Sequence, residues 1–306
     1  MTATLELRAG AARVVLAPEV GGAIVAYEWS GKPVLRPTPS DALAAGDVQR
    51  FGSYPLLPFS NRIAGATLRW QGNTYSLLRY IPEVPHAIHG NGWRRAWSVL
   101  EREPARATLE LVHDAAGEHA REWPFPYRAQ QRFDLADDTL TMTLAIANIG
   151  AAPFPFGLGW HPYFPRSATT LLGFAADAVW QTDPTVLPTR LESVPAQWRF
   201  APPRPIADTR LDHCFVGWRR PATLSRPEQS LRTMIDADAA CTHLVVYVPA
   251  ERDFLAIEPV THMTDAFNRA EAGQRDTGTR VLAPGARFSC TMHLSPATPD
   301  SPDARV

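Results

Sequence analysis

The stretch Thr139-Leu140-Thr141-Met142-Thr143-Leu144-Ala145-Ile146-Ala147 decides the fold class, because large apolar residues alternate with small or polar ones along it. Successive side chains of a β-strand point to opposite faces of a sheet. A period of two over this length therefore predicts an antiparallel strand with one buried face.

Other short runs of this kind, separated by Gly- and Pro-containing turns, predict strands along the whole chain. They span residues 5–8, 13–16, 24–29, 66–70, 74–78, 97–101, 107–113, 128–135, 170–174, 178–181, 231–235, 243–248, 254–258 and 287–294. Helical periodicity is nowhere sustained, so we expect an all-β protein with few short helices.

The Pro-rich segment 184–205 is expected to form an ordered surface loop, anchored by Trp198 and Phe200. No internal repeat and no shift in composition marks a domain boundary. We therefore predict a single β-sandwich domain over residues 1–295, followed by a frayed C-terminal tail over residues 296–306.

Charge and composition exclude several classes of protein. The 306 residues include 30 basic and 31 acidic side chains, without a basic block that would follow a phosphate backbone, so a nucleic-acid partner is not expected. Three widely spaced cysteines and an N-terminus without an apolar signal segment favour a cytoplasmic protein. The uncharged stretch 139–165 contains four prolines, which argues against a membrane-spanning helix.

Two residues are candidates for acid–base chemistry. His161 lies among aromatic rings and two glycines in the segment 156–164, where it is either a core histidine or a positioned acid or base. Glu258 ends the apolar run 254–258, on the same face as Phe254 and Ala256. Burial of that carboxylate favours either an ion pair with an arginine or a base with a raised pKa.

Further polar residues follow glycine-rich or aromatic loops, and they are Asn61, Arg62, His89 and Asp212. The spacing of His86 and His89 allows a metal pair, but the sequence between Pro85 and Arg95 is too rich in Gly and Asn for an aligning helix, so no metal site is expected. The sequence has no nucleophile elbow and no phosphate loop. Acid–base chemistry on a neutral polar ligand such as a sugar fits what remains.

The chain resembles the aldose 1-epimerase (galactose mutarotase) family. The resemblance covers about residues 5 to 295 and rests on five segments: Asn61-Arg62-Ile63, His89-Gly90 with Trp93 and Trp97, Gly159-Trp160-His161-Pro162-Tyr163-Phe164, Asp212-His213, and Glu258-Pro259 with Ala266-Phe267-Asn268 downstream. It implies a large antiparallel β-sandwich of the supersandwich type, in agreement with the predicted strands.

The resemblance also implies roles for single residues. Glu258 matches the base that removes the proton of the anomeric hydroxyl, and His161 matches the acid that protonates the ring oxygen. Arg62, His89 and Asp212 match positions that bind sugar hydroxyls, with Asn61 in support. No cofactor is implied, and the expected partner is a monosaccharide, bound by a monomer or homodimer.

Several alternatives stay open on the sequence. Arg94 and Arg95 would allow a hexose-6-phosphate 1-epimerase, and a sugar-binding protein without turnover is possible on the same scaffold. His262 either contacts the sugar or is an ordinary loop histidine. The preferred sugar is undecided, and any of Trp93, Trp160 and Phe267 is a candidate to stack on it.

Overall fold

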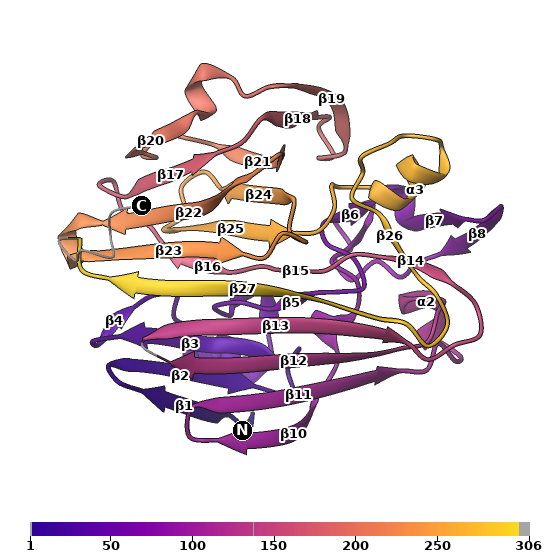
Figure 1. Ribbon diagram of the computed structural model, residues 1–306, viewed down its shortest axis with the longest axis horizontal. Helices are drawn as coiled ribbons and strands as arrows, with labels where there is room; N and C mark the ends of the chain where they lie inside the picture. The colour runs from indigo at the N-terminus through magenta and orange to yellow at the C-terminus, as the bar shows by residue number, and fades with distance from the viewer. Residues whose placement is uncertain (1, 137, 300–306) are drawn as a thin grey trace.

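The structure is a computed structural model that describes residues 2–136 and 138–299. Its largest element is a nine-stranded sheet. Its strands follow the order β10 (Ser98–Glu103), β11 (Arg106–His113), β12 (Tyr127–Ala136), β13 (Thr139–Asn148), β27 (Arg287–Ala297), β23 (Leu231–Ala237), β22 (Arg219–Arg226), β17 (Leu171–Ala175) and β20 (Phe200–Pro205). The stretch that opened the sequence analysis is β13, near the middle of this sheet (Figure 1).

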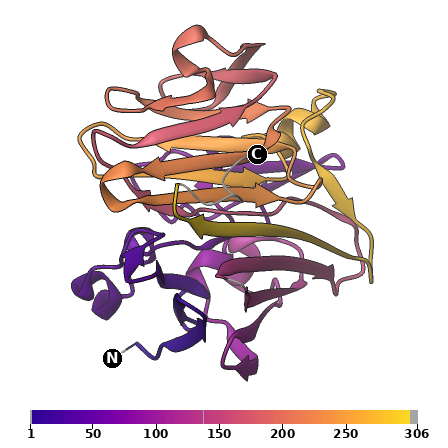
Figure 2. The same ribbon diagram turned by 60° about the vertical axis from the view of Figure 1, so that its left-hand side comes forward.

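The second layer is divided into two sheets. An eight-stranded sheet contains β19 (Pro188–Ser193), β18 (Ala178–Thr182), β21 (Leu211–Val216), β24 (His243–Val248), β25 (Phe254–Val260), β15 (Gly159–Trp160) and β5 (Pro55–Leu56) in that order, with β16 (Tyr163–Pro165) also paired to β25. A four-stranded sheet contains β1 (Leu5–Ala9), β2 (Ala12–Ala17), β3 (Ala23–Trp29) and β4 (Lys32–Pro33). Figures 1 and 2 show both sheets stacked on the nine-stranded sheet, one on each half.

Small elements connect these sheets. Three two-stranded ladders pair β6 (Arg62–Ile63) with β9 (Ala87–Ile88), β7 (Thr67–Trp70) with β8 (Asn73–Ser76), and β14 (Phe154–Phe156) with β26 (Arg280–Leu282). The α-helices of the described chain are α1 (Ser40–Ala45), α2 (His119–Glu122) and α3 (Ala266–Glu271), and none is long and apolar enough to cross a membrane. The predicted all-β antiparallel sandwich with few short helices is thus confirmed.

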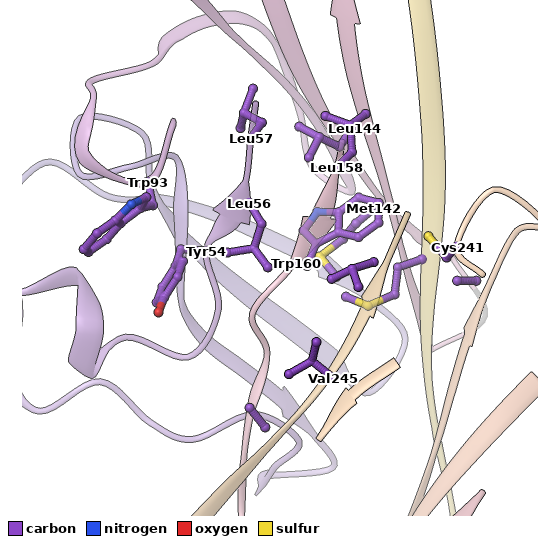
Figure 3. Packing of buried hydrophobic residues seen from close by; sticks show 14 of the residues in the cluster. Tyr54, Leu56, Leu57, Trp93, Met142, Leu144, Leu158, Trp160, Cys241 and Val245 are labelled. Carbon is purple, nitrogen blue, oxygen red and sulfur yellow. The ribbon is translucent and has the colours of Figure 1, made fainter. Parts of the chain in front are cut away.

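The alternation in β13 produces the predicted packing. Leu140, Met142, Leu144 and Ile146 are at most 1% exposed, whereas the threonines between them are half-buried. Figure 3 shows Met142 and Leu144 close to Trp160 of the eight-stranded sheet, in the core between the layers. Burying such side chains contributes roughly 1.5–3 kcal/mol each, which makes this interface the main source of stability.

Two expectations are corrected by the structure. The segment 184–205 contains two strands, β19 and β20, at edges of the two large sheets, because extended Pro-rich backbone can pair at a sheet edge where one of its sides stays unpaired. Strand β27 continues to Ala297 and pairs with β23 there, two residues into the expected tail. Residues 300–306 of that tail lie outside the described residues.

One glycine fixes the loop that carries His89 and Trp93. Gly90 has φ +66°, and a Cβ at this position would overlap the carbonyl oxygen of Leu57. That oxygen accepts hydrogen bonds from the backbone N–H groups of Asn91 and Gly92, both at 3.1 Å. The loop and the segment around Leu57 therefore approach each other more closely than any side chain at position 90 allows.

We expect Gly90→Ala to lower the free energy of unfolding by about 3 kcal/mol, because the backbone clash adds to the cost of a left-handed alanine. The matched control is Gly72→Ala, where φ is +75° but no atom lies within 4 Å of the added Cβ. It should cost only about 1 kcal/mol. Urea unfolding of both variants measures the difference, and equal losses would contradict the close approach.

Candidate functional site

Glu258 lies on a face of the eight-stranded sheet that cross-strand pairing defines. Asp212 of β21 pairs with Tyr247 of β24, Tyr247 pairs with Ala256 of β25, and Ala256 pairs with Tyr163 of β16. Paired residues point to the same side, and Glu258 follows Ala256 by two positions, so it shares their face. Leu255 and Ile257 on the opposite face are fully buried.

His161 reaches this face from the chain that leaves β15. Gly159 pairs with Val260, and a Cβ on Gly159 would lie 2.7 Å from the carbonyl oxygen of Pro259, so β15 packs tightly against the end of β25. The backbone N–H of His161 donates to the carbonyl of Tyr54 at 3.0 Å. As a result, Nε2 of His161 lies 3.3 Å from Oε1 of Glu258, and the two residues are 6% and 2% exposed.

Burial decides how this pair holds its proton. It raises the pKa of Glu258 well above the usual range, and the nearby Asp212 carboxylate raises it further. It also lowers the pKa of His161 to about 3, with Arg36 and Arg62 acting in the same direction. Both shifts disfavour the charged forms, so burial favours a proton on Glu258 over one on His161.

Asn61 and His89 fix each other through the backbone. The N–H of Asn61 donates to Nδ1 of His89 at 3.1 Å, and the N–H of His89 donates to the carbonyl of Asn61 at 2.8 Å. Both residues have positive φ, at 55° and 64°. Because Nδ1 accepts a hydrogen bond, Nε2 carries the proton of the neutral ring and is left as a donor. The ring lies edge-on to His161, with centroids 5.3 Å apart.

Arg62 and Asp212 form the more open side of the site. The guanidinium of Arg62 lies 3.4 Å from the carboxylate of Asp212 and donates to the side-chain oxygen of Asn61 at 3.0 Å. Their side chains are 14% and 30% exposed, more than those of His161 and Glu258. The structure therefore brings together all six residues selected from the sequence, although they are far apart along the chain.

Three residues near the pair were not selected as site residues from the sequence. Tyr54 and Tyr163 have ring centroids 4.9 Å and 4.3 Å from that of His161, and their hydroxyls are 3.2 Å apart. The guanidinium of Arg36 lies 3.9 Å from the centre of the Tyr163 ring. Tyr163 stands two positions after His161, which is a weak sequence signal, but nothing in the sequence indicates that Arg36 reaches the same place.

The three candidate stacking aromatics are all buried in the core. Trp93, Trp160 and Phe267 are at most 2% exposed. Trp93 stacks on Tyr54 at 5.4 Å, and Phe267 packs against Phe59. Trp93 therefore supports Tyr54, a ring beside His161, whereas Phe267 packs among other aromatic side chains of the core. Tyr247 is a half-buried aromatic on the site face.

The residues left open in the sequence analysis have identifiable contacts. His262 donates from Nδ1 to the carbonyl of Met263 at 2.7 Å and accepts at Nε2 from the N–H of Ser60 at 3.0 Å, so both ring nitrogens are used. Arg95 forms an ion pair with Glu122 at 2.8 Å. Arg94 lies over the rings of Trp93 and Tyr80, at 5.0 Å and 5.6 Å. Because both of its ring nitrogens are used, His262 is an ordinary structural histidine.

Residues 3–295 match the model of the aldose 1-epimerase family. The chain is 31% identical over 282 residues to the uncharacterized protein YphB of Escherichia coli K12, which covers 90% of this chain and 92% of YphB. Another E. coli K12 protein, the uncharacterized YihR, is 30% identical over 224 residues, 70% of each chain.

Solved structures agree over nearly the whole chain. The crystal structure of a candidate aldose 1-epimerase from E. coli K12 superposes with a TM-score of 0.85 at 28% identity, covering 97% of this chain and 99% of that one. A galactose mutarotase-like protein from Clostridium acetobutylicum also gives a TM-score of 0.85, at 19% identity over 96% and 94% of the two chains, which shows the fold.

We expect Glu258→Gln to stabilise the protein increasingly as the pH rises. The raised pKa means that folded Glu258 keeps a proton that the unfolded chain releases above its ordinary pKa of 4.5. The wild-type free energy of unfolding therefore falls with rising pH, by up to ~1.4 kcal/mol per pH unit until the folded pKa is reached. Glutamine has no such proton, so the advantage of the variant over the wild type should widen as the pH rises above about 5.

Urea unfolding across this range measures the difference. The control is Glu118→Gln, which makes the same exchange at a side chain that is 88% exposed. A constant difference between Glu258→Gln and the wild type would contradict the raised pKa.

Proposed function

Because the chain belongs to the aldose 1-epimerase family, we propose that it is an isomerase that interconverts the α and β anomers of free aldohexoses. The observation that carries this proposal is the contact between His161 and Glu258, 3.3 Å apart in a buried position. Oε2 of Glu258 has no hydrogen-bond partner among the described residues. A carboxyl oxygen with free capacity, next to an imidazole, fits a ligand that offers hydroxyls.

Ring opening requires one proton to leave the anomeric hydroxyl and another to reach the ring oxygen. We assign the first to Glu258 as base and the second to His161 as acid. The shared proton must then move from Glu258 to His161 across their contact before the sugar reacts. General acid and base catalysis contribute roughly 10²- to 10⁴-fold each.

The protons balance over one cycle of ring opening and reclosure. Opening turns a carboxylate and an imidazolium into a carboxylic acid and a neutral imidazole, the forms that burial favours in this site. Rotation about the bond from C1 to C2 and reclosure on the other face return the protons by the reverse transfers. The reaction neither consumes nor releases protons, and it uses no nucleophile and no cofactor.

Arg62, His89, Asp212 and Asn61 are proposed to hold the sugar. Arg62 and the Nε2–H of His89 are donors, and Asp212 is an acceptor, so together they match hydroxyls that both donate and accept. Asn61 orients Arg62 through its side-chain oxygen. We further propose a cytoplasmic monomer or homodimer, as expected from the sequence.

We expect the protein to accelerate anomer exchange of glucose or galactose over the buffer rate, as measured by polarimetry. Glu258→Gln and His161→Gln should each lower kcat roughly 10²- to 10⁴-fold, because each removes one proton transfer. The control is His119→Gln, a half-exposed histidine on α2, which should keep wild-type activity. A folded protein that binds sugar but accelerates exchange of no common aldose would instead be a sugar-binding protein.

We expect free glucose to be turned over at least about tenfold more efficiently than glucose 6-phosphate, because a phosphate near the Asp212 carboxylate costs energy and Arg95 is already paired with Glu122. NMR exchange rates for both sugars give kcat/KM. Arg94→Met is the matched test of the remaining arginine and should leave the ratio unchanged. Faster turnover of glucose 6-phosphate, lost in Arg94→Met, would identify a hexose-6-phosphate 1-epimerase.

A further inference from the structure

Arg36 occupies an unusual position beside the candidate site. Its guanidinium carbon lies 3.9 Å from the centre of the Tyr163 ring and 4.5 Å from that of Phe254, two rings that are perpendicular to each other. Nη2 donates to the carbonyls of Gln49 and Phe51 at 2.8 Å and 2.9 Å. These acceptors are neutral, and the nearby Asp253 carboxylate acts on Arg36 without forming an ion pair with it among the described residues, so the contacts fix the guanidinium while its charge stays unpaired.

The backbone ties the same residues together. The N–H of Arg36 donates to the carbonyl of Tyr163 at 2.8 Å, so the chain after β4 runs beside β16. Phe254 pairs with Pro165 at the start of β25, the strand that carries Glu258. Arg36 therefore contacts both the strand that carries Tyr163 and the strand that carries Glu258.

His161 depends on aromatic contacts for its orientation. Histidines that act as acids are usually held by a hydrogen bond at the ring nitrogen away from the substrate. In His161 that nitrogen, Nδ1, has no partner among the described residues. The Tyr163 ring instead stacks on the imidazole, with centroids 4.3 Å apart and planes inclined by 29°. Whatever holds Tyr163 therefore also holds His161.

We propose that Arg36 is a positioning residue for His161, holding the Tyr163 ring against the imidazole and placing an unpaired positive charge next to the acid of the reaction. This inference rests on the proposed function for the role of His161. The positive charge of Arg36 disfavours the imidazolium form of His161. It therefore makes His161 a stronger proton donor and favours the neutral ring after the transfer.

The other groups around His161 do not supply this charge. Arg62 also lowers the pKa of His161, but Asp212 offsets its charge at 3.4 Å. Burial lowers the pKa of His89 well below its usual value, so that ring is neutral. Burial raises the pKa values of Tyr54 and Tyr163, so both phenols are neutral as well. Glu258, the partner in the proton pair, completes the set. After burial, Arg36 has the largest effect on the pKa of His161.

The test compares Arg36→Met, Arg36→Lys and the control Arg50→Met. Arg50 belongs to the same segment of the chain, but it pairs with Asp41 at the surface and stacks on no ring. We expect Arg36→Met to lower kcat about tenfold with KM nearly unchanged, and to move the limbs of the pH–rate profile to higher pH by about one unit.

Lysine keeps the charge but not the planar stack. Arg36→Lys should therefore lower kcat while leaving the limbs near their wild-type positions, and Arg50→Met should match the wild type in both. Thermal unfolding confirms that each variant is folded. Wild-type kcat in Arg36→Met, or a lower kcat without a shift of the limbs, would overturn the proposal.

A second measurement is independent of turnover. NMR titration of ¹⁵N-labelled histidines, with His161 assigned through His161→Gln, should show a higher pKa for His161 in Arg36→Met than in the wild type. An unchanged pKa would overturn the role of the charge. If the wild type exchanges no anomers, the proposed function fails, while the titration still decides whether Arg36 acts on His161.

Discussion

The site depends on one physical constraint, the free-energy cost of a charge that is buried away from solvent. His161 and Glu258 touch at 3.3 Å where almost no solvent reaches them. Burial penalises the ionised form of each group, so it favours a protonated Glu258 beside a neutral His161. The surroundings serve this pair: Gly159 lets β15 lie against the end of β25, and Tyr54 and Tyr163 cover the imidazole. The tightly packed end of β25 thus holds an acid and a base in contact where burial favours the neutral form of each.

The loops on this face are stabilised by backbone contacts, which leaves their side chains free. Asn61 and His89 exchange hydrogen bonds while both adopt left-handed backbone, and Gly90 lies against Leu57. The side chains of Arg62 and Asp212 are positioned by the ion pair between them and by the hydrogen bond from Arg62 to Asn61. As a result, the site is rigid around His161 and Glu258 and more open at Arg62 and Asp212, whose side chains are more exposed.

Alternation of side chains was enough to predict most strands and the fold class, because a half-buried strand leaves a period of two in the sequence. It missed β22 and the edge strands β19 and β20, where prolines and charges hide that period, and it missed two- and three-residue strands such as β5, β15 and β16, which are too short to show one. The six site residues could be selected from their loop settings and the family resemblance. Arg36 could not, since its place follows from a hydrogen bond to Tyr163, far along the chain. Nor could sequence tell that Trp93, Trp160 and Phe267 are core residues.

Strand β27 has a consequence for how the chain folds. It lies between β13 and β23, so the nine-stranded sheet consists of two parts that only residues 287–297 join. Every partner of this strand precedes it in the chain, and β13 is separated from it by more than a hundred residues. Contacts of such sequence separation form slowly, because a long loop must close first. During synthesis the edges of β13 and β23 therefore stay unpaired until β27 emerges, an interval in which they can pair with other chains.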